Sequence, residues 1–141
     1  MECRAINPWK WQDELDFSQA VEVRGDHRVV YCAGQTSCAA DGTPMHPGDM
    51  LAQYHRALDN LETVLGGAGL GLADVVRLNY YVTDVPAFME AAPVVSERMR
   101  TAGCKPSSTL LGVVRLAEPE FMIEIEATAV ADPLPSGRDA E

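Results

Sequence analysis

The stretch from Phe121 to Ala131 most constrains the fold, because its side chains alternate between two kinds of surface. In a β-strand, successive side chains point to opposite faces of the sheet. One face carries only apolar residues, namely Phe121, Ile123, Ile125, Ala127 and Ala129. The other face carries Met122, Glu124, Glu126, Thr128 and Val130. The sequence therefore predicts a strand whose apolar face packs on helices and whose other face is mixed.

Two amphipathic helices are predicted before that strand. Asp49 is a suitable N-cap, because its side chain can accept a hydrogen bond from the first helical turn. After it, apolar residues recur at steps of three and four, and they are Leu51, Tyr54, Leu58, Leu61 and Leu65. A second helix begins at Asp84 and ends before Gly103, with a stripe of Phe88, Ala92, Val95 and Met99. Pro93 lies inside this pattern and predicts a kink or a break.

The remaining regular segments are predicted to be strands. They are rich in β-branched and aromatic residues, and they cover residues 17–23, 28–35, 75–82, 108–116 and 121–131. Turn-forming residues predict a hairpin between the first two strands and another between the last two. With a parallel connection through each helix, the order ββαβαββ gives an α/β fold, a two-layer α+β sandwich. We expect one domain at residues 17–131, between a polar arm (1–16) with Trp9 and Trp11 and a flexible tail (132–141).

Such a fold leaves one face of its sheet without a cover. Two helices can pack on only one face, yet the strand at 108–116 is largely apolar on both. Leu110, Gly112 and Val114 lie on one side of it, and Leu111 and Val113 lie on the other. Contact with another copy of the chain would remove the uncovered apolar surface from water. The sequence therefore predicts a closed homo-oligomer.

Composition excludes several classes of partner. Eleven Lys and Arg against 21 Asp and Glu give a formal net charge of −10, which repels phosphate and argues against nucleic-acid binding. The longest apolar runs are far shorter than the roughly 20 residues of a membrane span, and the start of the sequence shows no secretory signal. We expect a cytoplasmic protein. The spacing of its Cys and His residues matches no metal motif, and no cofactor or metal is expected.

A set of short motifs points to a known family. They include Phe17-Ser18-Gln19-Ala20-Val21, Tyr31-Cys32-Ala33-Gly34-Gln35, Leu72-Ala73-Asp74-Val75-Val76-Arg77-Leu78, Pro106-Ser107-Ser108-Thr109 and Ile123-Glu124-Ile125-Glu126-Ala127. In this order and spacing, from about residue 17 to residue 131, the sequence resembles the RidA family, also called the YjgF or L-PSP endoribonuclease family. The resemblance implies a chorismate-mutase-like ββαβαββ domain that forms a homotrimer with small-molecule clefts between subunits.

The resemblance also implies a type of chemistry. The best-known activity of the family is hydrolysis of reactive enamines and imines to 2-keto acids and ammonia, which needs a carboxylate-binding cation and groups that handle water and protons. In the deaminases of the family, an arginine in a Pro-x-Arg-Ser/Thr motif holds the substrate carboxylate. We match that position to Ser107, so the arginine is missing. Lys105, two residues earlier, can supply the charge, although a lysine lacks the planar fork of a guanidinium.

Other candidate residues follow from the same resemblance. Glu124 is the expected catalytic residue, which would position or deprotonate a water molecule. The expected substrate-binding positions are Phe17, Ala33, Gly34, Ala92, Lys105, Ser107 and Thr109. Besides Ser107, three of them also depart from the family, with Phe17 for a tyrosine, Ala33 for a serine and Ala92 for an asparagine. The alternatives are that Glu124 is only a solvated or ion-paired carboxylate between subunits and that Lys105 is an exposed loop residue.

Three functions remain open from the sequence. The first is a RidA-like hydrolase, of the enamine or imine deaminase type, with a rearranged anion site. The second is a non-catalytic trimer that binds a small metabolite in the same clefts, since loss of the arginine removes the main anchor. The third is the ribonuclease activity implied by the L-PSP name, against which the net charge of −10 argues.

Overall fold

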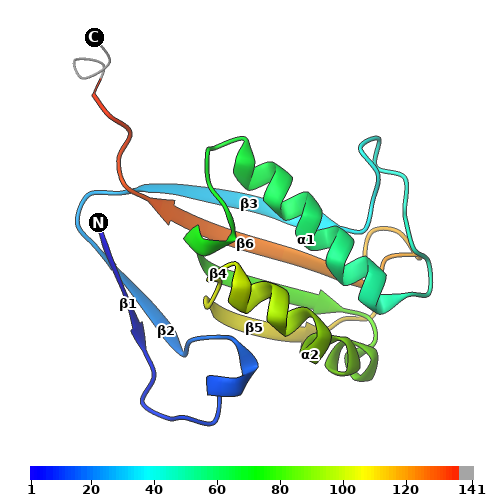
Figure 1. The fold of residues 1–141 in the computed structure, drawn as a ribbon. Helices are drawn as coiled ribbons and strands as arrows, with labels where there is room; N and C mark the ends of the chain where they lie inside the picture. The colour runs from blue at the N-terminus through cyan, green and yellow to red at the C-terminus, as the bar shows by residue number, and fades with distance from the viewer. Residues whose placement is uncertain (137–141) are drawn as a thin grey trace.

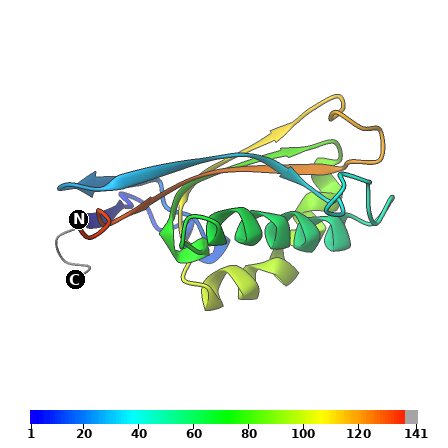
Figure 2. The ribbon, with the colours of Figure 1, turned by 90° about the horizontal axis from the view of Figure 1, so that it is seen from above.

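The computed structural model describes residues 1–136, and its centre is a four-stranded sheet in the order β3-β6-β4-β5 (Figure 1). The strands are β3 (Arg28–Thr36), β4 (Val75–Val82), β5 (Ser107–Gly112) and β6 (Ile123–Ala131). Helices α1 (Met50–Gly66) and α2 (Val85–Thr101) lie side by side on one face of this sheet (Figure 2). The two-layer α+β fold predicted from the sequence is confirmed. The last five residues of the expected tail, 137–141, lie outside the described residues.

The predicted parallel connections are confirmed. Strands β4 and β5 are parallel, with Arg77 opposite Ser107 and Val82 opposite Gly112. Strand β6 runs antiparallel to both β3 and β4, so β3 and β4 run in the same direction on either side of it. Helix α1 therefore links β3 to β4, and α2 links β4 to β5, each through a crossover between parallel strands.

The two predicted hairpins are wrong. Strand β2 (Ala20–Arg24) pairs with β1 (Glu2–Ile6) rather than with β3, and these two strands form a separate antiparallel sheet. At the other end, β6 lies between β3 and β4 and not beside β5. The central place suits β6, because its helix-facing residues Ile123, Ile125, Ala127 and Ala129 are almost completely buried. An edge position would leave part of this apolar row in contact with water.

The N-terminal arm contains a strand that the sequence does not predict. All five residues of β1 are exposed, and the only apolar residues that alternate with polar ones in it are the small Cys3 and Ala5, which is too short a pattern to predict a strand. A short 3-10 helix, Asp13–Leu15, follows, and the chain returns along β2, so that a two-stranded ribbon stands beside the main sheet (Figure 1). Trp9 and Trp11 are largely exposed. The arm is thus ordered mainly by backbone pairing with the first strand of the expected domain.

The two long helices begin where the sequence predicts. The Asp49 side chain accepts a hydrogen bond from the Ala52 N–H at 3.0 Å, and the Asp84 side chain accepts one from the Ala87 N–H at 3.0 Å. Helix α2 is continuous through Pro93, so the alternative of a break at this residue is wrong. Between the helices and the sheet lies a core whose fully buried members include Leu58, Leu61, Leu65, Leu78, Val95, Ile123 and Ile125.

Neither helix covers the opposite face of the four-stranded sheet. There, Tyr31 of β3 is 81% exposed and Leu111 of β5 is 49% exposed. Each is a neighbour in sequence of a side chain that packs toward the helices, Cys32 and Leu110 respectively. The absence of a cover over this face is thus confirmed for residues 1–136. A search of the same residues finds no helix that is both long and apolar enough to span a membrane.

Candidate functional site

The four-stranded sheet divides the candidate residues into two groups. Phe17 and Ala92 line a cavity on the side that carries the helices, whereas Glu124 and Gly34 meet on the uncovered face. In β6, Ile123 is buried against the helices, and the alternation of a strand directs Glu124 to the other side. A single copy of the chain therefore keeps the two groups on opposite faces of the sheet.

The cavity on the helix side has a volume of about 390 Å³. It lies between α2, the segment that precedes β2, and the helix-facing side chains of β5. Its wall is mainly apolar and includes Leu15, Phe17, Met89, Ala92, Met99 and Leu110. Ligand sites typically measure about 300–1,000 Å³ and are lined mostly by apolar side chains. The cavity therefore suits a small organic molecule with an apolar part.

Three aromatic rings form the floor of the cavity. Tyr54 of α1 stacks on Phe88 of α2, with 5.3 Å between the ring centroids and 17° between the ring planes. The ring of Tyr80 in β4 lies 5.2 Å from that of Phe88 and 5.6 Å from that of Tyr54. Burial raises the pKa of both tyrosines, because a phenolate would be poorly solvated there. At neutral pH the floor is therefore uncharged.

A charged pair also borders the cavity. Asp16, which directly precedes Phe17, and Arg100 of α2 both line it. The Arg100 Nε donates a hydrogen bond to Asp16 Oδ1 at 2.8 Å. The Asp16 side chain is only 11% exposed, whereas that of Arg100 is 63% exposed. The other carboxylate oxygen of Asp16, Oδ2, is buried and has no hydrogen-bond partner among residues 1–136.

On the uncovered face, the Glu124 carboxylate lies directly over the backbone of Gly34. A Cβ atom at residue 34 would overlap this carboxylate, so glycine opens the space that the Glu124 side chain occupies. The pairing of β3 with β6 shifts between Cys32 and Gln35, and this bulge holds Gly34 together with the exposed Ala33. The bulge thus brings three of the predicted site residues to one place.

A second carboxylate on the same face is held by two donors. The Asn79 side-chain amide donates to Glu126 Oε1 at 3.0 Å, and the Tyr81 hydroxyl donates to the same oxygen at 2.9 Å. These hydrogen bonds lower the pKa of Glu126, because they favour its ionised form. The hydrogen bond to Glu126 in turn raises the pKa of Tyr81. Glu126 is therefore an ionised carboxylate that already accepts hydrogen bonds from Asn79 and Tyr81 of the same chain.

Three predicted substrate-binding residues lie outside the cavity wall. The Ser107 hydroxyl donates to the Val76 carbonyl at 2.9 Å, and the Thr109 hydroxyl accepts a hydrogen bond from Arg77 Nη2. Lys105 is exposed and is not part of the wall. The structure therefore separates these three residues from the candidates that do line the cavity.

The serine that lines the cavity is Ser108. In the Pro-x-Arg-Ser/Thr pattern the arginine follows the proline by two residues, and from Pro106 this position is Ser108. The match to Ser107 is therefore one residue too early. The alternation of β5 agrees with this correction, because neighbouring side chains of a strand point to opposite faces. At this point the wall holds a serine hydroxyl where the motif has a guanidinium.

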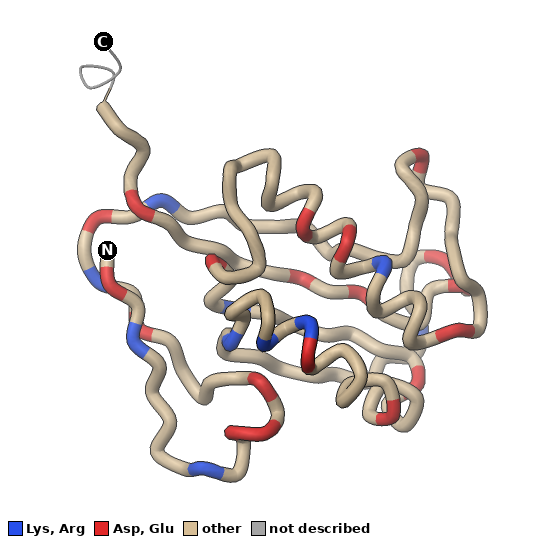
Figure 3. Tube along the Cα trace, viewed as in Figure 1, with Lys and Arg blue, Asp and Glu red and all other residues tan. Residues whose placement is uncertain are grey.

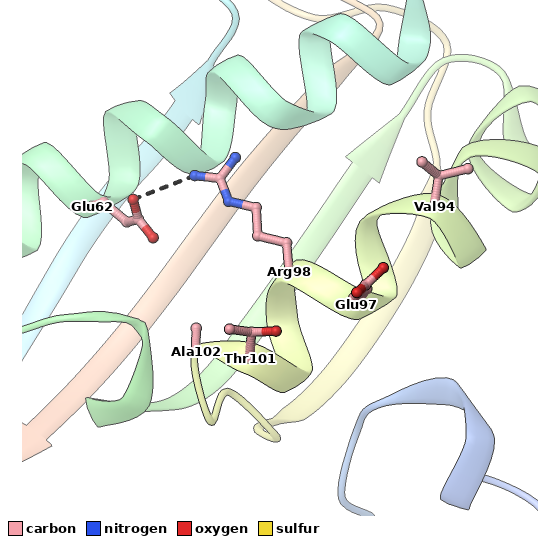
Figure 4. A pocket seen from close by; sticks show the side chains of 6 residues that line it. All are labelled: Glu62, Val94, Glu97, Arg98, Thr101 and Ala102. Atoms are coloured by element: carbon pink, nitrogen blue, oxygen red, sulfur yellow. Dashed lines mark hydrogen bonds and ion pairs between the residues drawn. The ribbon is translucent and has the colours of Figure 1, made fainter.

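A second, more open hollow lies between the two helices (Figure 4). Its central side chain, Arg98, contacts α1 through both of its terminal nitrogen atoms. Nη1 donates to the His55 carbonyl at 3.1 Å, and Nη2 lies 2.7 Å from Asp59 Oδ1 and 3.3 Å from Glu62 Oε2. These contacts tie α2 to α1. We therefore assign Arg98 a structural role.

Two of the four cysteines are packed in the core. Cys32 and Cys104 are buried, and all four cysteines are free thiols. Burial raises the pKa of the Cys104 thiol to about 12, so it remains protonated and unreactive at neutral pH. Within residues 1–136, no group of three or more His, Cys, Asp or Glu side chains is placed to hold a metal ion.

Sequence reasoning missed the Asp16–Arg100 pair. A signal for Arg100 exists, because Ala92, Ser96 and Arg100 are spaced by four residues on α2 and all line the cavity. No comparable local signal exists for Asp16, which lies 84 residues from Arg100 along the chain. Their meeting depends on the docking of the segment before β2 against α2.

The family is shown by comparison with known proteins. The family model described as Endoribonuclease L-PSP matches residues 12–131. The chain belongs to the RidA/YjgF family. Among Rid relatives, a RutC family protein of Pyrococcus abyssi is 31% identical over 113 residues, which cover 80% of this chain and 84% of the relative. The 2-iminobutanoate/2-iminopropanoate deaminase of Mus musculus is 30% identical over 119 residues, which cover 83% of this chain and 82% of the mouse protein.

Solved structures of the Rid family share the fold. A Rid-family protein of unknown function from Yersinia pestis superposes with a TM-score of 0.80 at 41% identity, over 92% of this chain and 98% of the other. The TdcF protein of E. coli, crystallised with bound serine, superposes with a TM-score of 0.66 at 25% identity, over 91% of each chain. The fold of this Rid chain is thus found in a protein that binds a small amino acid.

Proposed function

We propose that this Rid-family chain is a small-molecule hydrolase of the deaminase type. Its substrate is a small imine or enamine that carries a carboxylate, and its products are ammonia and a 2-keto acid. The observation that carries this proposal is the Glu124 carboxylate, which lies over Gly34 in space that only glycine leaves open. The mouse relative, whose name is 2-iminobutanoate/2-iminopropanoate deaminase, supports the reaction class.

The reaction needs one activated water molecule. Glu124 accepts a proton from the water molecule while the oxygen of that water adds to the imine carbon. Both protons of the water pass to the nitrogen, the carbon–nitrogen bond breaks, and ammonia leaves. One imine and one water thus become one carbonyl compound and one ammonia, without an oxidant or a reductant. A single carboxylate can serve these proton transfers, because it returns to its ionised form at the end.

We also propose that the working site forms between copies of the chain in a homotrimer. Within one chain, the cavity and Glu124 lie on opposite faces of the sheet. A neighbouring copy that packs on the uncovered face can bring the Glu124 of one copy to the cavity of the next. The same contact would remove the exposed Tyr31 and Leu111 from water. A shared site therefore agrees with both the placement of the residues and the exposed apolar surface.

One observation favours a second candidate function. Ser108 stands where the family motif has its carboxylate-binding arginine, and this loss is compatible with a trimer that binds a small metabolite without converting it. The ribonuclease activity in the name of the family model has less support. The formal net charge is −10, and Figure 3 shows Lys and Arg as short separate stretches, several of them around α2, with no long basic segment among the described residues.

The test of the proposed function is imine hydrolysis with a matched carboxylate variant. An amino-acid oxidase generates 2-imino acids in the assay, semicarbazide traps what remains, and ammonia and keto-acid release are followed. We expect wild type to accelerate release and Glu124→Gln to lose about a hundredfold of that acceleration, within the usual range for loss of a general base. Glu90→Gln, an exposed position on α2 outside the cavity wall, is the control.

Each other result of this assay has a definite meaning. Undiminished release by Glu124→Gln would contradict the role of this carboxylate. If wild type accelerates none of a series of imines with small, branched and aromatic side chains, the deaminase proposal fails and the metabolite-binding alternative takes its place.

A further inference from the structure

The guanidinium of Arg100 makes only part of the hydrogen bonds that it could donate. Its Nε donates to Asp16 Oδ1 at 2.8 Å, which is the one side-chain hydrogen bond or ion pair it makes within residues 1–136. Nη1 and Nη2 therefore remain for a ligand. Arg98, two residues earlier on α2, differs because both of its terminal nitrogens contact α1 (Figure 4). A guanidinium with two free donors can bind a carboxylate through two parallel hydrogen bonds.

Asp16 supplies the opposite charge beside Arg100. Asp16 lines the cavity, and its Oδ2 atom is buried and lacks a hydrogen-bond donor among the described residues. A buried carboxylate oxygen without a donor destabilises the folded protein. A ligand that donates a hydrogen bond to Oδ2 would remove this penalty. The unpartnered oxygen therefore points to a ligand with a hydrogen-bond donor, and a positively charged nitrogen is the donor that a carboxylate binds most strongly.

The two groups together match one kind of small molecule. In an α-amino or α-imino acid, the nitrogen and the carboxylate carbon are about 2.5 Å apart, because both are bonded to the same carbon. Arg100 and Asp16 are hydrogen-bonded neighbours, so a ligand that contacts both must carry its own opposite charges close together. The ligand carboxylate can contact the free edge of Arg100 while the ligand nitrogen donates to Asp16 Oδ2.

The rest of the cavity determines which side chain the ligand can carry besides its nitrogen and its carboxylate. Its volume is about 390 Å³, and beyond the charged pair it is lined by apolar and aromatic side chains such as Phe88, Met99 and Leu110. Ser108 is much smaller than the arginine of the family motif, so it leaves space that a guanidinium would fill. A side chain extending from the ligand into this space would be removed from water, which favours a bulky apolar group.

We propose that the Asp16–Arg100 pair replaces the missing motif arginine as the anchor of the cavity. The pair selects small zwitterionic α-amino or α-imino acids whose side chain is bulky and apolar. This assignment rests on the proposed function and names the class of substrate that its site accepts. Arg100 is the carboxylate-binding residue, and Asp16 both orients Arg100 and accepts a hydrogen bond from the ligand nitrogen.

Binding of stable amino acids tests the proposal without any turnover. Isothermal titration calorimetry with L-phenylalanine is compared with 3-phenylpropanoate, which lacks the nitrogen, phenethylamine, which lacks the carboxylate, and L-serine, which lacks the apolar side chain. We expect wild type to bind L-phenylalanine at least about tenfold more tightly than each of the other three, as is typical when one charged hydrogen bond or a large apolar contact is lost.

Two variants separate the roles of the pair. Arg100→Gln should weaken binding of both L-phenylalanine and 3-phenylpropanoate by about tenfold or more. Asp16→Asn should weaken binding of L-phenylalanine by a similar factor but leave that of 3-phenylpropanoate equal or stronger, because it removes a negative charge. Asp16 has a φ angle of 56°, and asparagine tolerates this left-handed conformation, so the variant should fold. Arg24→Gln, an exposed position on β2 away from the cavity, removes the same charge as a control.

The results separate this proposal from the proposed function. Absence of L-phenylalanine binding by wild type, or equal binding by Arg100→Gln and wild type with unchanged melting temperatures, would overturn the anchor. If wild type still hydrolyses imines in that case, the deaminase proposal stands and only the anchor fails. Binding with the expected pattern but without imine hydrolysis would support the anchor and contradict the deaminase proposal.

Discussion

The two faces of the central sheet differ in what they offer a ligand. The helix side holds a cavity of about 390 Å³ with an aromatic floor and one charged pair. The uncovered side holds two carboxylates, of which Glu124 lies over Gly34 and Glu126 accepts hydrogen bonds from Asn79 and Tyr81. One face is therefore suited to holding an apolar molecule, and the other to handling protons and water.

The alternation of side chains along a strand thus gives the two faces of one sheet different chemical properties. In β6, the residues that face the helices complete the core, and those between them carry the carboxylates. A closed active site cannot form across a packed sheet within one chain. It can form where the uncovered face of one copy meets the cavity of another. The substitution of Gly34 and a mixing experiment test that relation, and a substitution of Glu126 tests the hydrogen bonds on the uncovered face.

The largest effect is expected from Gly34→Ala. The added Cβ would overlap the Glu124 carboxylate, so the side chain must leave its position, and imine hydrolysis should fall by about a hundredfold, as for loss of a general base. Binding of L-phenylalanine in the cavity should be much less affected. Gly66→Ala is the control, because nothing lies within 4 Å of a Cβ at that position. Equal losses of binding and hydrolysis would show that the two faces are not functionally separate.

A mixing experiment tests whether two copies share one site. Ala92→Phe should block the cavity and Glu124→Gln should remove the carboxylate, so each variant alone should be inactive. In trimers co-expressed from equal amounts of the two, about a quarter of the clefts would combine an open cavity with an intact Glu124 from the neighbouring copy. Activity should therefore return to about a quarter of the wild-type rate. No recovery in verified mixed trimers would show that the two residues act within one chain.

The smallest effect is expected from Glu126→Gln. The hydrogen bonds from Asn79 and Tyr81 lower the pKa of Glu126 below its usual value of 4.5, so its folded pKa lies below its unfolded pKa. The resulting stabilisation is present above the unfolded pKa and is lost as the pH falls through the folded pKa. Because Glu126 remains partly exposed to solvent, this stabilisation should amount to less than about 1 kcal/mol.

Urea unfolding of wild type and Glu126→Gln over a range of pH measures this effect. The difference in the free energy of unfolding should be present at neutral pH and should shrink on acidification below pH 4.5. A difference that grows on acidification would contradict the assigned hydrogen bonds. Exposed Glu118→Gln in the loop before β6 is the matched control.

The sequence alone was sufficient for features that depend on neighbours along the chain. The helix starts at Asp49 and Asp84 follow from side chains that cap the first turn. The two faces of β6 follow from alternation, and they correctly place Glu124 away from the helices. Motif spacing likewise led to the correct family. These features are local, because a cap or an alternating face is defined within a few residues.

The tertiary structure decided which distant segments meet. The sequence placed β2 beside β3 and β5 beside β6, but β2 pairs with β1, and β6 occupies the centre of the sheet. It matched the lost arginine to Ser107, whereas Ser108 lines the cavity. Strand pairing and the contact of Asp16 with Arg100, 84 residues apart, depend on the sum of many long-range packing contacts. No short sequence pattern encodes that sum. The sequence by itself therefore determined which side of each helix and strand is apolar, and only the folded chain determined which of these sides pack against each other.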